Sequence, residues 1–444
     1  MARYSFKKNG RVVFRGRGSP IFTFDSTSFK SLYGKKACEL YGYFETYKVS
    51  EEEVLEFLKT LEEEGYVRNG VFTDTAKASE VIKEADLKDG SLYGIPRVLY
   101  ELANLVFFGG RTENACVEHE GENVVHFDLS SAYAYALTVP LPDWKQGKVF
   151  KNLSLRDLKE LDEEGWFGIV KGVFEDEDEE LPVLPVRKKV MGEEYVFFPY
   201  GRKEGFWTSL EVALLEKGKV EVAFLFKRRE FPALKESLLK LYEEKERARK
   251  EWLKVLRKGD LVKTFGLLAK KSPPPLGSGL IAFNRLVGAF VTAFVRRELY
   301  LALKVAKEYG KLLYWDTDGF LIDVRDLEGL ERRLRCGKGI GRWNVKEVYG
   351  KVRFECGGAK QYAIFKGDKI WIRWKGVRLY DSVIIEVSPA LGKLYAIRDN
   401  PWLGEEKLDY SSQPIPKRLG SRAFSVEELN EVFGGEKDER ERSF

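Results

Sequence analysis

Apolar residues recur at two different spacings along the chain, and this pattern predicts a mixed α+β protein. A spacing of three or four residues, typical of amphipathic helices, occurs in four segments: 50–67, 95–108, 232–258 and 283–310. Beyond segment 232–258 we expect the helical pattern to break at Gly259 and Gly266. The last segment is apolar over most of its length, so the helix that it predicts should be buried.

Short apolar runs bounded by turn residues predict strands between these helices. They lie at 11–14, 21–24, 124–131, 311–315 and 319–324, with a further hairpin at 360–376. The runs 311–315 and 319–324 enclose an acidic turn, which predicts a hairpin with carboxylates at its tip. Run 124–131 (VVHFDLSS) reads as a buried strand that ends in a polar corner.

Composition narrows the class of protein. The chain has 444 residues, of which 44% are hydrophobic, so it can bury sizeable cores. Four widely spaced cysteines favour reduced thiols over a disulfide framework or a zinc site, and no apolar run reaches the roughly 18 residues needed to span a bilayer. A net charge of +5 does not by itself identify a nucleic-acid-binding protein. Many charged residues with few Gln, Met, His and Cys suggest a thermophilic host, and we expect a cytoplasmic protein.

The candidate chemistry lies in two acidic segments. Asp316 and Asp318 stand at the predicted hairpin tip, and Asp128 ends the apolar strand 124–131. Separately, they could be a solvated turn and a helix N-cap. Together, carboxylates on two separate strands can hold two Mg²⁺ ions about 4 Å apart, the arrangement used for phosphoryl transfer. Hard oxygen ligands favour Mg²⁺, with Mn²⁺ as a substitute, over zinc, because His119 and His126 are the only histidines.

A basic stripe is the third candidate feature. Four residues recur at three- or four-residue intervals along the predicted helix: Arg247, Lys250, Lys254 and Lys258. They could form a solvated face paired with glutamates of the same helix. They could equally bind a triphosphate, since Lys and Arg neutralise the charge on a leaving pyrophosphate.

These segments, in this order, resemble the motifs of family B DNA polymerases, and most closely those of the protein-primed viral and plasmid branch. The matching segments are DLSSAYA (128–134, motif A, DxxSLYP), KGDLVKTFG (258–266, motif B, KxxxNSxYG), YWDTDG (314–319, motif C, YxDTDS), FFGGRTE (107–113, YxGG) and KQY (360–362, KxY). The likeness covers roughly residues 95–376. Each motif is weak alone, but five in the family's order are a strong signal.

The resemblance implies an α+β right-hand polymerase, with a palm of antiparallel sheet plus helices, helical fingers, a small thumb and a small α/β N-terminal domain. The boundaries that we expect are 1–106 for the N-terminal domain, a candidate degenerate exonuclease remnant, 107–150 for the first part of the palm, 151–231 for a palm or insertion region, 232–272 for the fingers, 273–375 for the second part of the palm, and 376–444 for the thumb and C-terminal tail.

Residue roles carry over from the same resemblance. Asp128, Asp318 and the backbone carbonyl of Leu129 would bind metal, with Asp316 as an auxiliary acid. The residues implied for dNTP binding are Ser131, Ala132, Tyr133, Arg247, Lys250, Lys254, Lys258, Phe265 and Gly266. Tyr133 would exclude a 2′-OH, although a tyrosine in these apolar surroundings could simply be part of the core. The residues implied for DNA binding are Phe107, Gly109, Gly110, Arg111, Thr317, Lys360, Tyr362 and Lys375.

The departures from the family pattern concern proofreading. The family's exonuclease opens with Asp-x-Glu on a strand, whereas this chain has Asp25 followed by Thr27. Ala132, Val262 and Gly319 also differ from the usual motif residues. We therefore expect a DNA-directed DNA polymerase without 3′→5′ proofreading; the alternatives are a primer-independent primase-polymerase and an inactive polymerase-like DNA-binding replication factor. The expected partners are primer-template DNA, dNTPs and, as a candidate, a terminal protein or other replication protein. We expect a monomer without a membrane partner, in the host cell of a virus, plasmid or mobile element.

Overall fold

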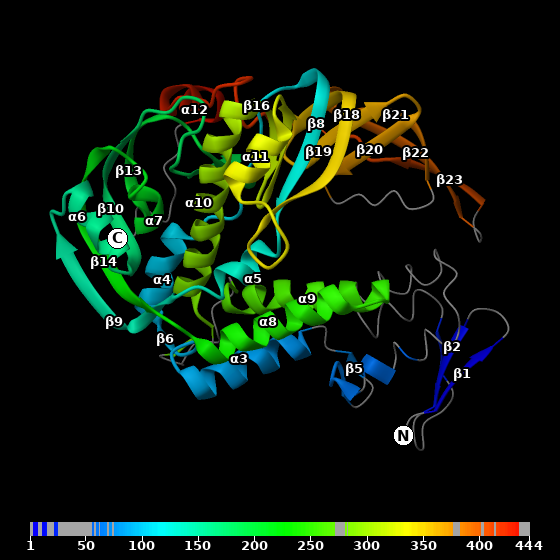
Figure 1. Cartoon of the computed structure of the whole chain (residues 1–444), viewed down its shortest axis with the longest axis horizontal. Helices are drawn as coiled ribbons and strands as arrows, with labels where there is room; N and C mark the ends of the chain where they lie inside the picture. Colours follow the sequence, from blue (N-terminus) through cyan, green and yellow to red (C-terminus); the bar gives the residue numbers. More distant parts are fainter. Residues whose placement is uncertain are drawn as a thin grey trace.

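The structure is a computed structural model. It describes residues 3–7, 11–15, 22–24, 56, 59–61, 63–68, 71–72, 75–270, 280–281, 283–375, 382–400, 404–412 and 414–434. Helices and strands are mixed throughout this part of the chain, which confirms the predicted α+β class (Figure 1). None of the helices within it is both long enough and apolar enough to cross a membrane.

A seven-stranded antiparallel sheet, in the order β20-β19-β18-β8-β17-β16-β7, combines strands from the two expected palm segments. Its strands are β7 (Thr112–Asn114), β8 (Glu118–Leu129), β16 (Gly310–Asp316), β17 (Gly319–Val324), β18 (Trp343–Gly358), β19 (Gln361–Lys366) and β20 (Lys369–Trp374). Alternating side chains place Phe127, Trp315 and Phe320 in the main hydrophobic core, and Tyr314 and Leu321 in a second core. Both predicted hairpins are present.

One long helix covers the main-core face of this sheet. Helix α10 (Arg285–Tyr309) contributes buried side chains along nearly its whole length, which confirms the buried helix predicted at 283–310. Helix α4 (Arg97–Val106) packs beside it, α5 (Ala132–Ala136) follows β8, and α11 (Leu327–Leu334) follows β17. The sheet therefore has a rigid support behind the strand ends that carry the predicted carboxylates.

A second, four-stranded antiparallel sheet has the order β13-β10-β14-β9. It consists of β9 (Leu141–Lys151), β10 (Trp166–Asp176), β13 (Gly201–Thr208) and β14 (Lys217–Arg229), with α6 (Leu155–Glu163) and α7 (Ser209–Val212). The hairpin β11 (Val186–Val190) and β12 (Glu193–Phe197) adjoins it. Helix α12 (Val426–Phe433) packs Leu429 against Phe197 of this hairpin. Helix α12 thus packs against a hairpin that lies between β10 and β13 in the chain.

The helix boundaries in the expected fingers region differ from the predicted ones. Instead of one helix over 232–258, there are two, α8 (Pro232–Arg247) and α9 (Glu251–Leu268), separated by extended backbone at Ala248 and Lys250. The expected breaks at Gly259 and Gly266 are wrong, because α9 runs through both. A helical glycine costs about 1 kcal/mol relative to alanine, and α9 offsets this by burying several side chains, including Trp252, Leu256, Leu261 and Leu268.

Part of the expected N-terminal domain packs against later segments of the chain. Helix α3 (Ala76–Asp89) packs against α8 and α9, and α4 packs in the main hydrophobic core. Short strand β6 (Ile95–Pro96) pairs with β15 (Leu280–Ile281). A three-stranded sheet is formed by β1 (Arg3–Lys7), β2 (Arg11–Arg15) and β3 (Phe22–Phe24), and a small hairpin by β4 (Val67–Arg68) and β5 (Val71–Phe72).

The remaining predicted features fall in part outside the described residues. Most of the helix expected at 50–67, the loop at 272–279 and the pair Asp25 and Thr27 lie outside them. In the expected thumb region, a three-stranded sheet combines β21 (Ser382–Ser388), β22 (Lys393–Asn400) and β23 (Gly404–Asp409), with a 3₁₀ turn η1 (Pro389–Leu391). Among the described cysteines, Cys116, Cys336 and Cys356 are free thiols.

Candidate active site

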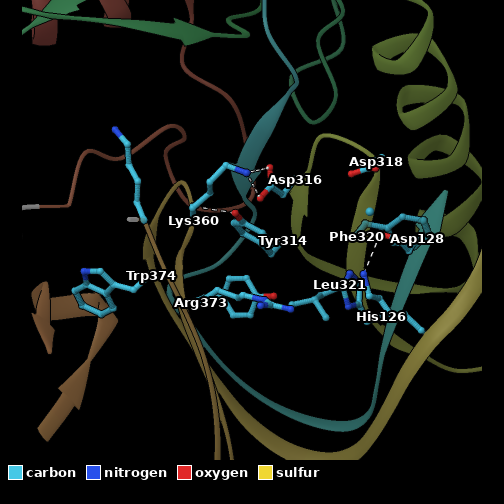
Figure 2. A pocket seen from close by; sticks show the side chains of 14 residues that line it. His126, Asp128, Tyr314, Asp316, Asp318, Phe320, Leu321, Lys360, Arg373 and Trp374 are labelled. Atoms are coloured by element: carbon cyan, nitrogen blue, oxygen red, sulfur yellow. Dashed lines mark hydrogen bonds and ion pairs between the residues drawn. The ribbon is translucent and has the colours of Figure 1, made fainter. Parts of the chain in front are cut away.

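The β16–β17 hairpin brings the predicted carboxylates together. Its tip is the turn Thr317–Asp318, where Thr317 takes a left-handed conformation (φ 63°). Strand β17 pairs with β8 in a register that sets Gly319 opposite Asp128. The Leu129 N–H also donates to the Asp318 carbonyl at 2.7 Å. Asp128 and Asp318, which are far apart in sequence, therefore stand at the ends of adjacent strands, on one side of a cleft (Figure 2).

The electrostatics of this pair favour a bound cation. Burial, together with the negative charges of Asp128 and Asp316, raises the pKa of the Asp318 carboxyl to about 6. Carboxylates that repel one another in a half-buried position are stabilised by a positive ion. Asp316 differs, since it already accepts hydrogen bonds from the Thr112 hydroxyl at 2.8 Å and from Lys360 Nζ at 2.6 Å.

The donor set suits a hard cation such as Mg²⁺. Within the described part of the chain, no group of three or more His, Cys, Asp or Glu side chains is arranged to hold a metal ion. Mg²⁺ commonly uses only one or two carboxylates, together with substrate phosphates and water. Two aspartates that face an open cleft fit this mode of binding, in which the nucleotide would complete the coordination.

The turn after β8 holds the segment that resembles motif A. Ser131 is left-handed (φ 52°) and its hydroxyl lies 3.3 Å from Lys245 Nζ of α8. Lys245 also stands 4.4 Å over the ring of Tyr242. Sequence reasoning missed Lys245, although the buried side chains Leu238 and Tyr242 mark the inward face of α8 that Lys245 continues at helical spacing.

The predicted basic stripe is not one surface. The break after α8 separates Arg247 from the other members, and Arg247 is exposed and paired with Glu243 at 3.1 Å, as the solvated-face alternative expected. Lys250, in the connection, pairs with Glu56. Lys254 and Lys258 lie one turn apart on α9, with Lys258 exposed. Arg247 therefore lies on a different helix from Lys254 and Lys258.

An aromatic stack joins motif A to the segment that resembles motif B. The rings of Tyr133 and Phe265 lie 4.4 Å apart and are nearly parallel, at 3°. Burial raises the pKa of Tyr133 to about 12, and the charge of Asp318 acts in the same direction. Ala132 beside it is buried, whereas a Cβ added at Gly266 would meet open space.

The FFGG segment lies against the β16–β17 hairpin. A Cβ added at Gly110 would come 2.4 Å from Thr317 Oγ1, so glycine lets the backbone approach the Thr317 side chain this closely. The Gly109 carbonyl accepts a hydrogen bond from Arg296 at 2.8 Å. The guanidinium carbon of Arg285 lies 3.3 Å from the centre of the Phe107 ring. This segment therefore supports the hairpin as well as approaching the cleft.

The DNA contact expected at Arg111 does not fit the structure. Arg111 is only 1% exposed, since it forms an ion pair with Glu113 at 2.5 Å and donates to the Pro182 carbonyl at 2.7 Å. Its guanidinium also packs over Phe198 and Trp315. Arg111 is a structural residue behind strand β16.

The KQY segment forms another side of the cleft. Lys360 is left-handed (φ 59°), and its N–H donates to the Tyr314 hydroxyl at 2.9 Å. Tyr362 is mostly buried, which raises its pKa to about 12, and its ring lies 4.8 Å from that of Tyr314. Lys375 also lines the cleft.

The cleft is lined by side chains of both charges, with Lys346 beside Asp128 and Lys360 beside Asp316. It has a volume of about 310 Å³, and Figure 2 shows Asp128 and Asp318 apart from Lys360 and Arg373 across it. Sequence reasoning did not single out His126, Lys346 and Arg373, which also line it. Cations facing metal-binding carboxylates can accept a phosphate-bearing ligand between them.

Comparisons with known proteins agree with this geometry. Residues 97–259 match the family model described as DNA polymerase type B, organellar and viral. This match spans the FFGG segment, the segment that resembles motif A and the first residues of the one that resembles motif B, and it supports the resemblance drawn from the motifs. No curated protein matches the sequence.

The solved structures that it resembles include those of phi29 DNA polymerase. The orthorhombic crystal form superposes with a TM-score of 0.59 at 15% identity, covering 83% of this chain and 74% of that one. Phi29 DNA polymerase complexed with primer-template DNA and incoming nucleotide substrates gives a TM-score of 0.57 at 15% identity, covering 83% and 73%. At this identity the likeness shows a shared fold.

Proposed function

We propose that this chain is a template-directed DNA polymerase that adds dNTPs to a primer 3′-OH by two-metal nucleotidyl transfer. The observation that carries the proposal is the register of β8 and β17, which aligns Asp128 with the residue after Asp318 at the mouth of a cleft. Asp128, Asp318 and the Leu129 carbonyl would hold the metal. Bound Mg²⁺, or Mn²⁺ in its place, would activate the 3′-OH and neutralise the pyrophosphate.

On the nucleotide side, the fingers would supply the phosphate contacts. Lys245 already reaches the Ser131 hydroxyl from α8, and Lys254 and Lys258 extend from α9. Tyr133, held flat against Phe265, would pack under the sugar and exclude a ribose 2′-OH. A stacked ring is a good steric gate because its orientation is fixed by its neighbour.

On the DNA side, the basic residues opposite the carboxylates would bind the primer strand. Lys360 would exchange its ion pair with Asp316 for a phosphate, and Lys375 lies near it on the cleft wall. Tyr362 and Thr317 would position the primer end, and Gly109 and Gly110 would leave room for the template. Phi29 DNA polymerase, which shares the fold, has been solved with primer-template DNA.

We further infer that the chain lacks proofreading and serves a virus, plasmid or mobile element of a thermophilic host. The support for the first part is Thr27 in place of the exonuclease glutamate after Asp25. The support for the second part is the family description and the charged, Gln-poor composition. A terminal protein is a candidate partner for priming. A primer with a mismatched, labelled 3′ end should stay intact when incubated with Mg²⁺ alone.

The proposal is tested with a primed and an unprimed template, each supplied with Mg²⁺ and four dNTPs. We expect templated extension of the primed template only, and none in EDTA. Synthesis on the unprimed template would show a primase-polymerase. Salt-sensitive DNA binding with no incorporation on either template would show an inactive replication factor.

A further inference from the structure

Lys346 is the one lysine of the described residues that forms an ion pair with the catalytic candidate Asp128. Its Nζ lies 3.4 Å from Asp128 Oδ1, and the lysine side chain is 47% exposed. The neighbouring Asn344 holds the backbone of the same residue, because its side-chain amide donates to the Asp128 carbonyl at 2.9 Å. Strand β18 thus contacts both the backbone and the carboxylate of Asp128.

The backbone explains why Lys346 reaches this position. The pairing of β18 with β8 shifts between Val345 and Glu347, so Lys346 is the extra residue of a β-bulge. Bulges near active sites redirect one side chain out of the regular alternation of the strand. Here the redirected side chain lines the cleft that contains Asp128 and Asp318.

The three aspartates of the cleft differ in the ion pairs that they form. Lys360 pairs with Asp316 at 2.6 Å and Lys346 pairs with Asp128, whereas Asp318 forms no ion pair with any residue that the structure describes. The charge of Lys346 also extends to Asp318: burial and Asp128 raise the pKa of that carboxyl, and Lys346 acts in the opposite direction. While no metal is bound, the positive charge of Lys346 therefore reduces the electrostatic repulsion between the carboxylates of Asp128 and Asp318.

We propose that Lys346 is a tethered counter-cation that divalent metal must displace from Asp128, so that it sets the metal concentration at which the active site fills. The inference rests on the proposed function, since it assumes that Asp128 and Asp318 bind metal. An ammonium and a divalent cation cannot both contact the same carboxylate oxygen without mutual repulsion. Lys346 therefore weakens metal binding while it stabilises the metal-free site.

The test measures Mn²⁺ binding directly, by electron paramagnetic resonance of free Mn²⁺, in the absence of DNA and nucleotide. Lys346→Met keeps the length of the side chain and removes its charge. We expect its Kd for Mn²⁺ to fall by about fivefold or more, as expected for the loss of a half-exposed ion pair of about 1 kcal/mol. Lys346→Arg, which keeps the charge, should bind Mn²⁺ as the wild type does. Mn²⁺ should also raise the Tm of Lys346→Met more than that of the wild type.

Lys351 provides a matched control on the same strand. It is exposed and pairs with Glu122 at 2.8 Å, away from the cleft, so Lys351→Met should leave the Kd unchanged. A Kd for Lys346→Met within twofold of wild type, or an equal effect of Lys351→Met, would overturn the inference. An unchanged Kd with a raised KM for dNTP would also overturn it, and would assign Lys346 to a phosphate contact. If Asp318→Asn binds Mn²⁺ as wild type does, the proposed metal site itself fails.

Discussion

Replacing Gly110 by alanine should disable catalysis without a change in any charged or reactive group. The new Cβ would lie 2.4 Å from Thr317 Oγ1, 2.8 Å from its Cγ2 and 2.9 Å from its Cβ. Ordinary contacts of this kind are about 3.5 Å or longer, so the hairpin tip must move by roughly 1 Å. The tip cannot turn away freely, because the Thr317 N–H donates to the Arg111 carbonyl at 2.7 Å.

A displacement of about 1 Å at reacting groups can cost about 100-fold in rate, and overpacking of this kind costs about 1–3 kcal/mol of stability. We therefore expect Gly110→Ala to lower kcat for single-nucleotide incorporation by about 100-fold, at a temperature where circular dichroism shows it folded. Gly109→Ala is the matched control, since its added Cβ would meet nothing within 4 Å.

The double variant Gly110→Ala/Thr317→Gly locates the cause of the loss. Thr317 is left-handed, so glycine is tolerated there, and its removal relieves the clash. Activity of the double variant should return to that of Thr317→Gly alone, a coupling of about 1–3 kcal/mol. Wild-type activity in Gly110→Ala, or an equal loss in Gly109→Ala, would refute the argument from close approach.

Three further predictions follow from other contacts. Burial raises the pKa of Asp260 to about 6 from an ordinary 3.8, so the folded state holds this proton more tightly and stability falls as the pH rises from about 4 to about 6. Asp260→Asn should remove this decrease in the free energy of unfolding, which is up to about 3 kcal/mol. Urea unfolding at both ends of the pH range measures it, and an unchanged decrease in the variant would contradict the prediction. Arg111→Met should cost up to about 3–5 kcal/mol of stability by breaking the buried ion pair with Glu113, less whatever the remaining partner Arg418, 3.6 Å away, retains. It should not change the salt dependence of DNA binding; a shallower salt dependence would restore Arg111 as a DNA contact. Phe265→Leu should increase ribonucleotide incorporation relative to dNTP incorporation, measured as the ratio of kcat/KM values, because Tyr133 loses its stacking partner; an unchanged ratio would remove the stack from sugar selection.

The β16–β17 hairpin could be predicted from sequence because its signals are local. Two apolar strands and the turn Asp-Thr-Asp-Gly lie within fifteen residues, and the structure places the hairpin where the pattern predicted it. Strand β8 was recognised for the same reason. What local signals could not supply is the register that sets Gly319 opposite Asp128, since it depends on residues far apart in the chain.

The fingers show where sequence reasoning failed. Gly259 and Gly266 predict helix ends by intrinsic propensity, but packing of α9 against α3 and α8 overrides that preference. Lys245 escaped notice because its partner Ser131 lies on another element. The function of a lysine on a helix face depends on what faces it.

Arg111 and Lys346 both show that sequence spacing alone does not reveal which groups a basic side chain contacts. An arginine after two glycines in a polymerase-like motif suggests a DNA contact, yet Glu113 and the Pro182 carbonyl hold Arg111 inside the protein. Lys346 has no motif at all, and a β-bulge brings it to Asp128. Burial and bulges are tertiary features, so neither position could be assigned from spacing.

The central claim is that Asp128 and Asp318 form the catalytic pair of a DNA polymerase, and single-turnover incorporation of one templated nucleotide into a primed duplex tests it most directly. Asp323 supplies the control, because it lies on the same strand β17 but pairs with His119 at 2.9 Å, away from the hairpin tip. We predict that wild type and Asp323→Asn incorporate the templated nucleotide at similar rates, and that Asp318→Asn is slower by about 1,000-fold or more, equivalent to about 4 kcal/mol. Incorporation by Asp318→Asn within tenfold of wild type, or none by wild type with Mg²⁺ or Mn²⁺, would contradict the claim.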